Sequence, residues 1–361
     1  MTASKSPLRR KKSAFTVLLL YAICVFISSP DSVSGQISVN NRSCQTLRSM
    51  ARVYMAYSDY DKAQPLIERA IDLVSSNPSA NETKGLYMTD LAWLYKQQGK
   101  LKDAETVCLK AIDQIRRNFG EKHQYLASAL RISASIYAYQ GKYPEARRAL
   151  QEAIDIMLES YASTDQVVAP FMIDLAKIFA DEGNIEEAHD RYIQTIEVIN
   201  NSYGPGHLYT AGVNVQIASL YTMQGKYSEA EKILLPALEI QKQVYGPDHC
   251  AMTQSRIILA AIYCEKAEYN LAETLLKMTL KIVTDKCGRS HPDTGKVLTA
   301  LGKLYIAEGK LTQARNVSRR AYDVFEGLFQ PGHPDIAELN RQTEQIRMQL
   351  QLAYAPEAMA M

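Results

Sequence analysis

The sequence lacks several features that would assign it to a common functional class. Its 361 residues carry 41 lysines and arginines against 39 aspartates and glutamates, and this near balance does not suggest a nucleic-acid partner. Its longest apolar stretch, residues 14–27, is shorter than the roughly 20 positions that a membrane-spanning helix needs. Motifs for a nucleophile elbow, a phosphate loop and a zinc protease are missing. We therefore expect no enzyme and no cofactor.

The first 35 residues follow a pattern of their own. A basic start, residues 9–12, precedes the apolar stretch 14–27, which is broken only by Thr16, and small residues close the segment at 33–35. This order is typical of a secretory signal peptide, with cleavage expected between Gly35 and Gln36. We expect a secreted or lumenal protein; if the leader is retained, residues 14–27 would anchor the chain in a membrane instead. Without the leader the net charge falls from +2 to about −2.

The rest of the chain repeats itself. A tyrosine or phenylalanine, usually a glycine four residues later and an alanine nine residues later recur every 42 residues. The copies are Tyr95/Gly99/Ala104, Tyr137/Gly141/Ala146, Phe179/Gly183/Ala188, Tyr221/Gly225/Ala230, Tyr263/Ala272 and Tyr305/Gly309/Ala314, with a degenerate copy at Tyr54/Ala63. A fixed period of this length indicates stacked units that are not stable alone.

Within one unit, the apolar spacing predicts two helices. In the copy over residues 209–245, apolar residues three and four positions apart mark one buried face in each half. Gly225 is suited to end the first helix, and Ala230 to a close crossing of the two helices. We therefore predict an all-α solenoid of about seven helix–turn–helix repeats over residues 44–335. A polar lead-in at 36–43, a capping helix at 336–352 and a flexible tail at 353–361 complete the expected organisation.

These residues resemble the tetratricopeptide repeat, in particular the 42-residue form of the kinesin light chains. The resemblance rests on small and aromatic positions such as Ala218, Tyr221 and Gly225, and on the linkers at 246–249 and 332–335. It implies a right-handed solenoid. The asparagines that line the cargo groove in kinesin light chains are absent, and this position holds, in successive copies, Asp90, Ile132, Asp174, Gln216, Ile258 and Ala300. A cytosolic motor adaptor is therefore disfavoured.

The register of the resemblance also implies a concave groove formed by the first helices. Aromatic and arginine side chains are enriched where proteins bind one another. The groove candidates are Arg52, Trp93, Lys96, Arg131, Tyr139, Lys177, Met223 and Lys303. Their basic bias suggests a partner with acidic segments, although Trp93 could equally serve only to pack against the neighbouring helix.

Five histidines recur at one position of the linkers. They are His123, His207, His249, His291 and His333. Successive units stack about 8–10 Å apart, too far for these side chains to meet at one metal ion. We expect them to orient the turn that begins each unit, and we expect no metal site.

Cysteines and glycosylation motifs give weaker indications. Five cysteines remain outside the leader, so at least one is unpaired within the chain. Cys250 should begin the first helix of its repeat and Cys287 should follow the second, which would place them side by side in a disulfide; buried free thiols are the alternative. Possible N-glycosylation sites are Asn41, Asn81, Asn200 and Asn316.

Together these features predict a non-enzymatic interaction scaffold of the secretory pathway or cell exterior, which binds a peptide or protein along the concave groove. The alternative is a structural assembly factor that uses the convex second helices or the chain ends. It would have no peptide ligand, and an uncleaved leader would hold it at a membrane.

Overall fold

The computed structural model of the chain describes residues 35–76, 82–160 and 165–358. The chain divides into two compact units, residues 1–42 and 43–361. Of the first unit, only the beginning of one helix is described. Within the described residues the secondary structure consists of fifteen α-helices and one short 3₁₀ helix, without strands. The predicted signal peptide at 1–35 lies almost wholly outside the described residues, as does the predicted loop at 77–81.

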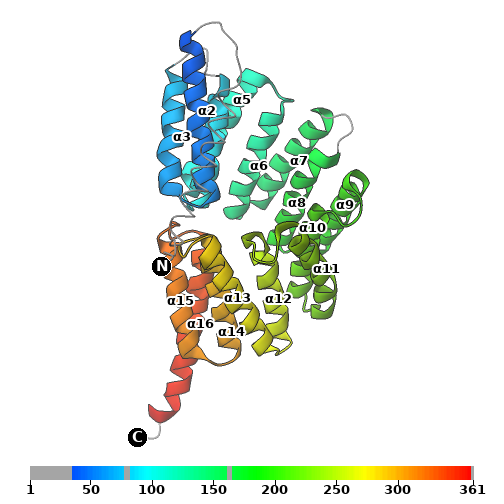
Figure 1. The fold of residues 1–361 in the computed structure, drawn as a ribbon, viewed down its shortest axis with the longest axis vertical. Coiled ribbons are helices and arrows are strands. Elements are labelled where there is room, and N and C mark those ends of the chain that lie inside the picture. Colours follow the sequence, from blue (N-terminus) through cyan, green and yellow to red (C-terminus); the bar gives the residue numbers. More distant parts are fainter. Residues whose placement is uncertain (1–34, 77–81, 161–164, 359–361) are drawn as a thin grey trace, which may run out of the picture. The chain divides into compact units, whose positions relative to one another are not determined.

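The helices form seven successive pairs and one further helix (Figure 1). From α4 onward, the first helix of each pair packs on the second and on the first helix of the next pair. The pairs are α2 (Gly35–Ala56) with α3 (Tyr60–Ser75), α4 (Lys84–Gln97) with α5 (Leu101–Phe119), α6 (Gln124–Tyr139) with α7 (Tyr143–Ser160), α8 (Asp165–Glu182) with α9 (Ile185–Tyr203), α10 (Leu208–Met223) with α11 (Tyr227–Tyr245), α12 (Thr253–Glu265, preceded by η2, Cys250–Met252) with α13 (Tyr269–Lys286), and α14 (Pro292–Ala307) with α15 (Leu311–Glu326). The last helix is α16 (Pro334–Ala358). The predicted α-solenoid is thus confirmed.

The turn inside each pair depends on one residue in a left-handed backbone conformation. In the fifth pair this residue is Gly225, with φ +73°, and the amide of Lys226 donates to the Tyr221 carbonyl at 2.8 Å. Glycine adopts this conformation without the steric cost that a Cβ brings. Two pairs have no glycine there, and Ser58 (φ 56°) and Ala267 (φ 60°) take the conformation instead.

Five of the linkers that follow a helical pair depend on histidine. In each of the five predicted positions the imidazole Nδ1 accepts a hydrogen bond from the backbone amide two residues later, at 3.1–3.2 Å. The histidine therefore caps a helix N-terminus, a role usually filled by serine, threonine, aspartate or asparagine. The prediction that these side chains orient the turns is confirmed.

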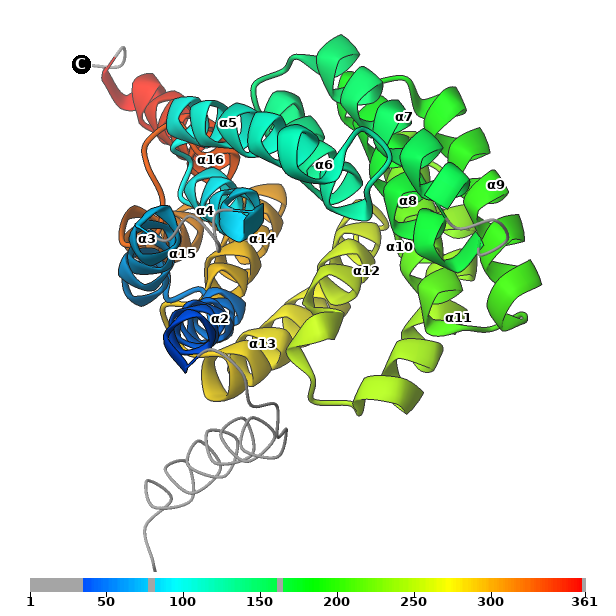
Figure 2. The ribbon, with the colours of Figure 1, turned by 90° about the horizontal axis from the view of Figure 1, so that it is seen from above.

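Within residues 43–361 the first pairs contact the last. The amide of Gln330 donates to the Gln98 carbonyl at 2.7 Å, and the rings of Tyr139 and His333 lie 6.0 Å apart, edge to face. Leu94 of α4 and Phe325 of α15 belong to one buried apolar cluster. Figure 2 shows the curved path of the helices, and Figure 1 shows one end of α3 facing one end of α15. We call this contact, between the turns at 57–61 and 98–100 and the loops at 287–291 and 327–333, the seam.

The helices extend into two segments that the prediction left outside them. The expected lead-in at 36–43 is helical, because α2 already begins at Gly35 and no glycine or proline follows within this segment. The expected tail at 353–361 is helical as far as Ala358, since α16 continues through a segment rich in alanine, leucine and glutamine. The last three residues lie outside the described part of the chain.

No helix in the described part of the chain combines the length and the apolar character that spanning a bilayer requires.

Candidate functional site

The first four pairs form a cavity of about 620 Å³ on the inner side of the curve. Apart from Leu150 of α7, its walls come from α2, α4, α6 and α8, which are the first helices of these pairs. Figure 2 shows α4, α6, α10 and α12 on the inner side of the curve and α7, α9 and α11 on the outer side. The volume lies within the range of sites that hold small ligands or short peptide segments.

Six of the eight residues proposed from the sequence line this cavity. They are Arg52, Trp93, Lys96, Arg131, Tyr139 and Lys177. The other two lie elsewhere: Met223 ends α10 with its side chain 64% exposed, and Lys303 of α14 pairs with Glu338, with 2.6 Å between Nζ and Oε1. The structure thus groups the candidates of the first four pairs into one site.

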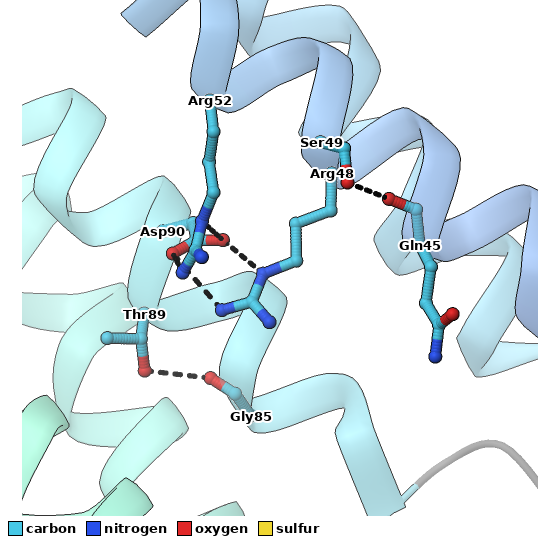
Figure 3. A network of polar contacts seen from close by, with 7 residues as sticks. All are labelled: Gln45, Arg48, Ser49, Arg52, Gly85, Thr89 and Asp90. Atoms are coloured by element: carbon cyan, nitrogen blue, oxygen red, sulfur yellow. Dashed lines mark hydrogen bonds and ion pairs between the residues drawn. The ribbon is translucent and has the colours of Figure 1, made fainter. Parts of the chain in front are cut away.

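Two arginines of α2 share one carboxylate of α4 (Figure 3). Nε of Arg48 lies 2.5 Å from Oδ2 of Asp90, and Nη2 of Arg52 lies 3.0 Å from its Oδ1. Asp90 is only 8% exposed, so the two guanidinium groups offset the cost of burying its charge. Arg48 and Asp90 are 42 residues apart, within one residue of the step between these two repeats, which places them at nearly the same level of neighbouring helices.

A similar pair joins α6 to α8. Nε of Arg131 lies 2.5 Å from Oδ2 of Asp174, and its guanidinium carbon lies 5.3 Å from the centre of the Phe171 ring. Asp90 and Asp174 therefore each hold arginine side chains from the first helix of the preceding pair. Arg52 and Arg131, expected from the sequence to face an acidic partner, are already engaged by carboxylates of the chain.

Lys96 differs from these arginines. It is 9% exposed, and its Nζ lies 4.9 Å from the centre of the Tyr139 ring, in a cation–π contact. Within the described part of the chain no carboxylate lies within ion-pair distance of this ammonium. Burial, and next the positive charge of Lys177, lowers the pKa of Lys96 to about 8.

The aromatic side chains of the cavity have structural contacts as well. Trp93 is half-buried and lies edge to face with Tyr60, with ring centres 6.5 Å apart. It therefore both packs against α3 and lines the cavity. Burial raises the pKa of Tyr139 to about 12, so its hydroxyl stays protonated and can donate a hydrogen bond at neutral pH.

The remaining predicted sites lie outside the cavity. Cys250 and Cys287 are joined by a disulfide, while the described residues Cys44, Cys108 and Cys264 are free thiols. Asn316 is exposed on α15, and the side-chain oxygen of Asn200 accepts a hydrogen bond from Thr210 at 3.1 Å. Asn41 lies in α2 without a described side chain, and Asn81 lies outside the described residues.

In the described part of the chain, no three or more histidine, cysteine, aspartate or glutamate side chains are grouped to hold a metal ion.

Sequence reasoning missed Arg48 and Asp181 as lining residues and treated Asp90 and Asp174 only as departures from the family. The available signal was that the separation of Arg48 and Asp90 lies within one residue of the repeat length. Asp181, a turn beyond Lys177 on α8, carried no comparable mark. Partial desolvation raises the pKa of this carboxyl, and the Lys177 ammonium opposes that rise.

The fold is similar to that of several solved structures. The quorum sensor NprR from B. thuringiensis, in its apo form, has a TM-score of 0.56 at 17% identity, with 95% of this chain and 94% of that chain covered. The Rap conjugation gene regulator of the plasmid pLS20, solved with the Phr* peptide, has a TM-score of 0.57 at 14% identity, with 90% and 86% covered. A putative kinesin light chain from Podosopora anserina, with nearly identical TPR-like repeats, has a TM-score of 0.43 at 20% identity, with 56% and 96% covered.

Sequence comparison identifies the family. A search of curated proteins finds no match. The sequence model of the tetratricopeptide repeat matches residues 86–159, 168–234 and 251–327, which together are more than half of the chain. These segments contain all or part of each helix from α4 to α15. The chain therefore belongs to the tetratricopeptide repeat family.

Proposed function

We propose that this protein is a non-enzymatic interaction scaffold that holds a peptide or a protein segment in the cavity of its first four helical pairs. The observation that carries the proposal is the convergence of Trp93, Tyr139 and the basic side chains on one cavity at the inner face. Aromatic and arginine side chains in a partly desolvated hollow are typical of binding hot spots. A Rap regulator of similar fold was solved with a peptide, which makes a peptide a reasonable class of ligand.

We also propose that the protein acts in the secretory pathway or outside the cell. The signal-peptide pattern of residues 1–35 supports this location. The Cys250–Cys287 disulfide supports it independently, because disulfides persist mainly in oxidising compartments. Mass spectrometry of the protein recovered from the culture medium would test it, since a mature N-terminus near Gln36 is expected. Recovery only from the cytosol, with an intact leader, would contradict this part of the proposal.

The binding proposal is tested by affinity purification of the wild-type protein and two variants. Trp93→Ala removes the largest aromatic side chain of the cavity and should reduce partner recovery at least about tenfold, because hot-spot aromatics contribute 2 kcal/mol or more. Met223→Ala removes an exposed side chain outside the cavity and should leave recovery unchanged. Equal recovery with all three proteins, each with a native circular dichroism spectrum, would exclude the cavity as the binding site.

A second candidate function, assembly through the outer face, has one observation in its favour. Leu109, Ile193 and Leu235 are exposed on α5, α9 and α11 and occupy the same position of their repeats. Substitution of Ile193 and Leu235 by serine should then abolish recovery of the partner complex while Trp93→Ala has no effect. The opposite outcome favours the cavity.

A further inference from the structure

Lys96 is a buried lysine, and its ammonium forms no ion pair with a carboxylate of the described residues. Its side chain lines the cavity, the residue is only 9% exposed, and its ammonium makes a cation–π contact with Tyr139. A buried ammonium without an anionic partner is costly, because protein atoms solvate the charge less well than water does. A methionine of similar volume would fill the same space without that cost, so the scaffold itself gives no reason for a lysine here.

The groups around Lys96 add to its need for an anion. From α6 come the Arg131 guanidinium and the Tyr139 ring, and from α8 the Lys177 ammonium and the Asp174 carboxylate. From the other side of the seam the Lys296 ammonium of α14 acts on Lys96, and Lys96 in turn acts on the His333 imidazole. Asp174 is the one carboxylate that favours the charged state of Lys96, and it is held by Arg131. The surroundings of Lys96 are therefore predominantly positive.

The other carboxylates that line the cavity interact with other cationic side chains and not with Lys96. The Asp90 carboxylate accepts hydrogen bonds from the guanidinium groups of Arg48 and Arg52. Asp181 lies beside Lys177, which favours its charged state. Five cationic side chains and three carboxylates line the cavity, so it carries two more positive than negative groups. One of these two charges remains in the Arg48–Arg52–Asp90 cluster. The other is left when the charge of Asp181 is set against those of Lys96 and Lys177.

We propose that Lys96 binds an oxyanion of the ligand: the cavity accepts an acidic peptide segment, one carboxylate of which pairs with the Lys96 ammonium and faces Lys177 at the exposed edge. This inference rests on the proposed function, since it assigns a chemical class to the peptide held there. The Tyr139 hydroxyl, which is protonated at neutral pH, is an additional donor within the same cavity. The arginines then position the walls, and Lys96 with Lys177 selects the ligand.

Binding of the carboxylate should be linked to protonation of Lys96. Burial lowers the pKa of the free Lys96 ammonium to about 8, and a carboxylate paired with it raises that pKa again. The protein must therefore take up a proton to bind at pH values above 8. Affinity for an acidic peptide should fall about tenfold per pH unit between pH 8 and the pKa in the complex. Arginine in place of Lys96 stays charged over this whole pH range, so the Lys96→Arg variant should bind the peptide with an affinity that does not depend on pH.

The experiment uses a phage-displayed library of random dodecapeptides, selected on the complete wild-type protein at pH 7. Enriched peptides are synthesised in three forms: unchanged, with each aspartate or glutamate replaced by its amide, and with an amidated C-terminus. The second form tests a side-chain carboxylate and the third a terminal one. Binding is measured by fluorescence anisotropy on the wild-type protein, Lys96→Met, Lys96→Arg and Trp93→Ala, after circular dichroism confirms that each variant is folded.

The proposal predicts that loss of one carboxylate weakens binding to the wild type at least about tenfold but leaves binding to Lys96→Met unchanged, because the partner charge is already gone. The wild-type affinity should decline above pH 8, and the Lys96→Arg affinity should not. Peptides that require Trp93 but bind Lys96→Met as tightly as the wild type would overturn the anion site and leave the proposed function standing. If no enriched peptide depends on Trp93, the proposed function fails and the anion site fails with it.

Discussion

Two features of the structure favour the neutral imidazole of His333. Its Nδ1 must be unprotonated to accept a hydrogen bond from the Asp335 amide, with 3.2 Å between the two nitrogens. Its ring is buried and stacks on the ring of Phe329, with ring centres 3.7 Å apart. Burial lowers the pKa of His333 to about 4, and the Asp335 carboxylate opposes this shift. The folded state therefore holds the neutral form well below the ordinary histidine pKa of about 6.5.

We predict that the stability of the protein falls on acidification partly because of this residue. A folded-state pKa below the unfolded value means that the contribution is complete above pH 6.5 and is lost as the pH falls toward 4. Urea unfolding at pH 7 and pH 4.5 should show a loss of about 1–3 kcal/mol that is attributable to His333. Asparagine caps helices well and does not titrate, so His333→Asn should have a smaller difference between the two pH values, whatever its stability at pH 7. An unchanged difference would contradict the assignment.

Single residues also show how far the sequence could be interpreted. The histidine caps could be predicted because one residue type recurs at one position, and any role that all five share must be local to the linker. The ion pairs of Arg52 and Arg131 could not be predicted. Whether an arginine is paired within the chain depends on which side chain of the next first helix lies opposite it. Asp90 and Asp174 do this in two repeats, whereas isoleucine or alanine fills the same position in others.

At the scale of one helical pair, the sixth repeat carries a measurable strain. Its turn lacks the glycine of the other regular repeats, and Ala267 adopts φ 60° while its amide donates to the Cys264 carbonyl at 3.0 Å. A left-handed conformation costs a residue with a Cβ roughly 1–2 kcal/mol. The sequence showed that glycine is missing here but not whether the turn would keep its geometry; packing of α12 on α13 maintains it.

Replacing Ala267 by glycine should therefore stabilise the protein by about 1 kcal/mol, although glycine normally destabilises an exposed position through the entropy of the unfolded chain. Thermal and urea unfolding measure the effect. The control is Ala138→Gly near the end of α6, a helical position where the same change should destabilise by about 1 kcal/mol. A loss of stability in Ala267→Gly would show that the turn is not strained.

Over the whole molecule, the period of 42 residues predicts that pairs stack but not where the stack ends. The curvature of a solenoid is the sum of small rotations between neighbours, so a slight change in each rotation decides whether the seventh pair meets the first. The seam exists because these rotations bring the Gln98 turn to the loop before His333. For the same reason the sequence placed Met223 and Lys303 on the inner face but could not show that the cavity ends at the fourth pair.

The seam can be tested with two glycines that share a repeat position and a backbone conformation. Gly99 and Gly141 have φ +77° and +73°, but a Cβ on Gly99 would lie 3.2 Å from the His333 Cβ, whereas one on Gly141 meets no atom within 4 Å. Asparagine tolerates this conformation better than other residues with a side chain, so Gly99→Asn and Gly141→Asn should pay a similar local cost.

We predict that Gly99→Asn loses about 1–3 kcal/mol more stability than Gly141→Asn, because only the first variant forces a side chain into the packed contact with the last loop. Hydrogen exchange should locate the difference: amide protection at Gln330 should fall in Gly99→Asn and remain native in Gly141→Asn, since the Gln330 amide donates across the seam to the Gln98 carbonyl. Equal destabilisation with native protection at Gln330 in both variants would mean that the two ends of the solenoid do not meet in solution.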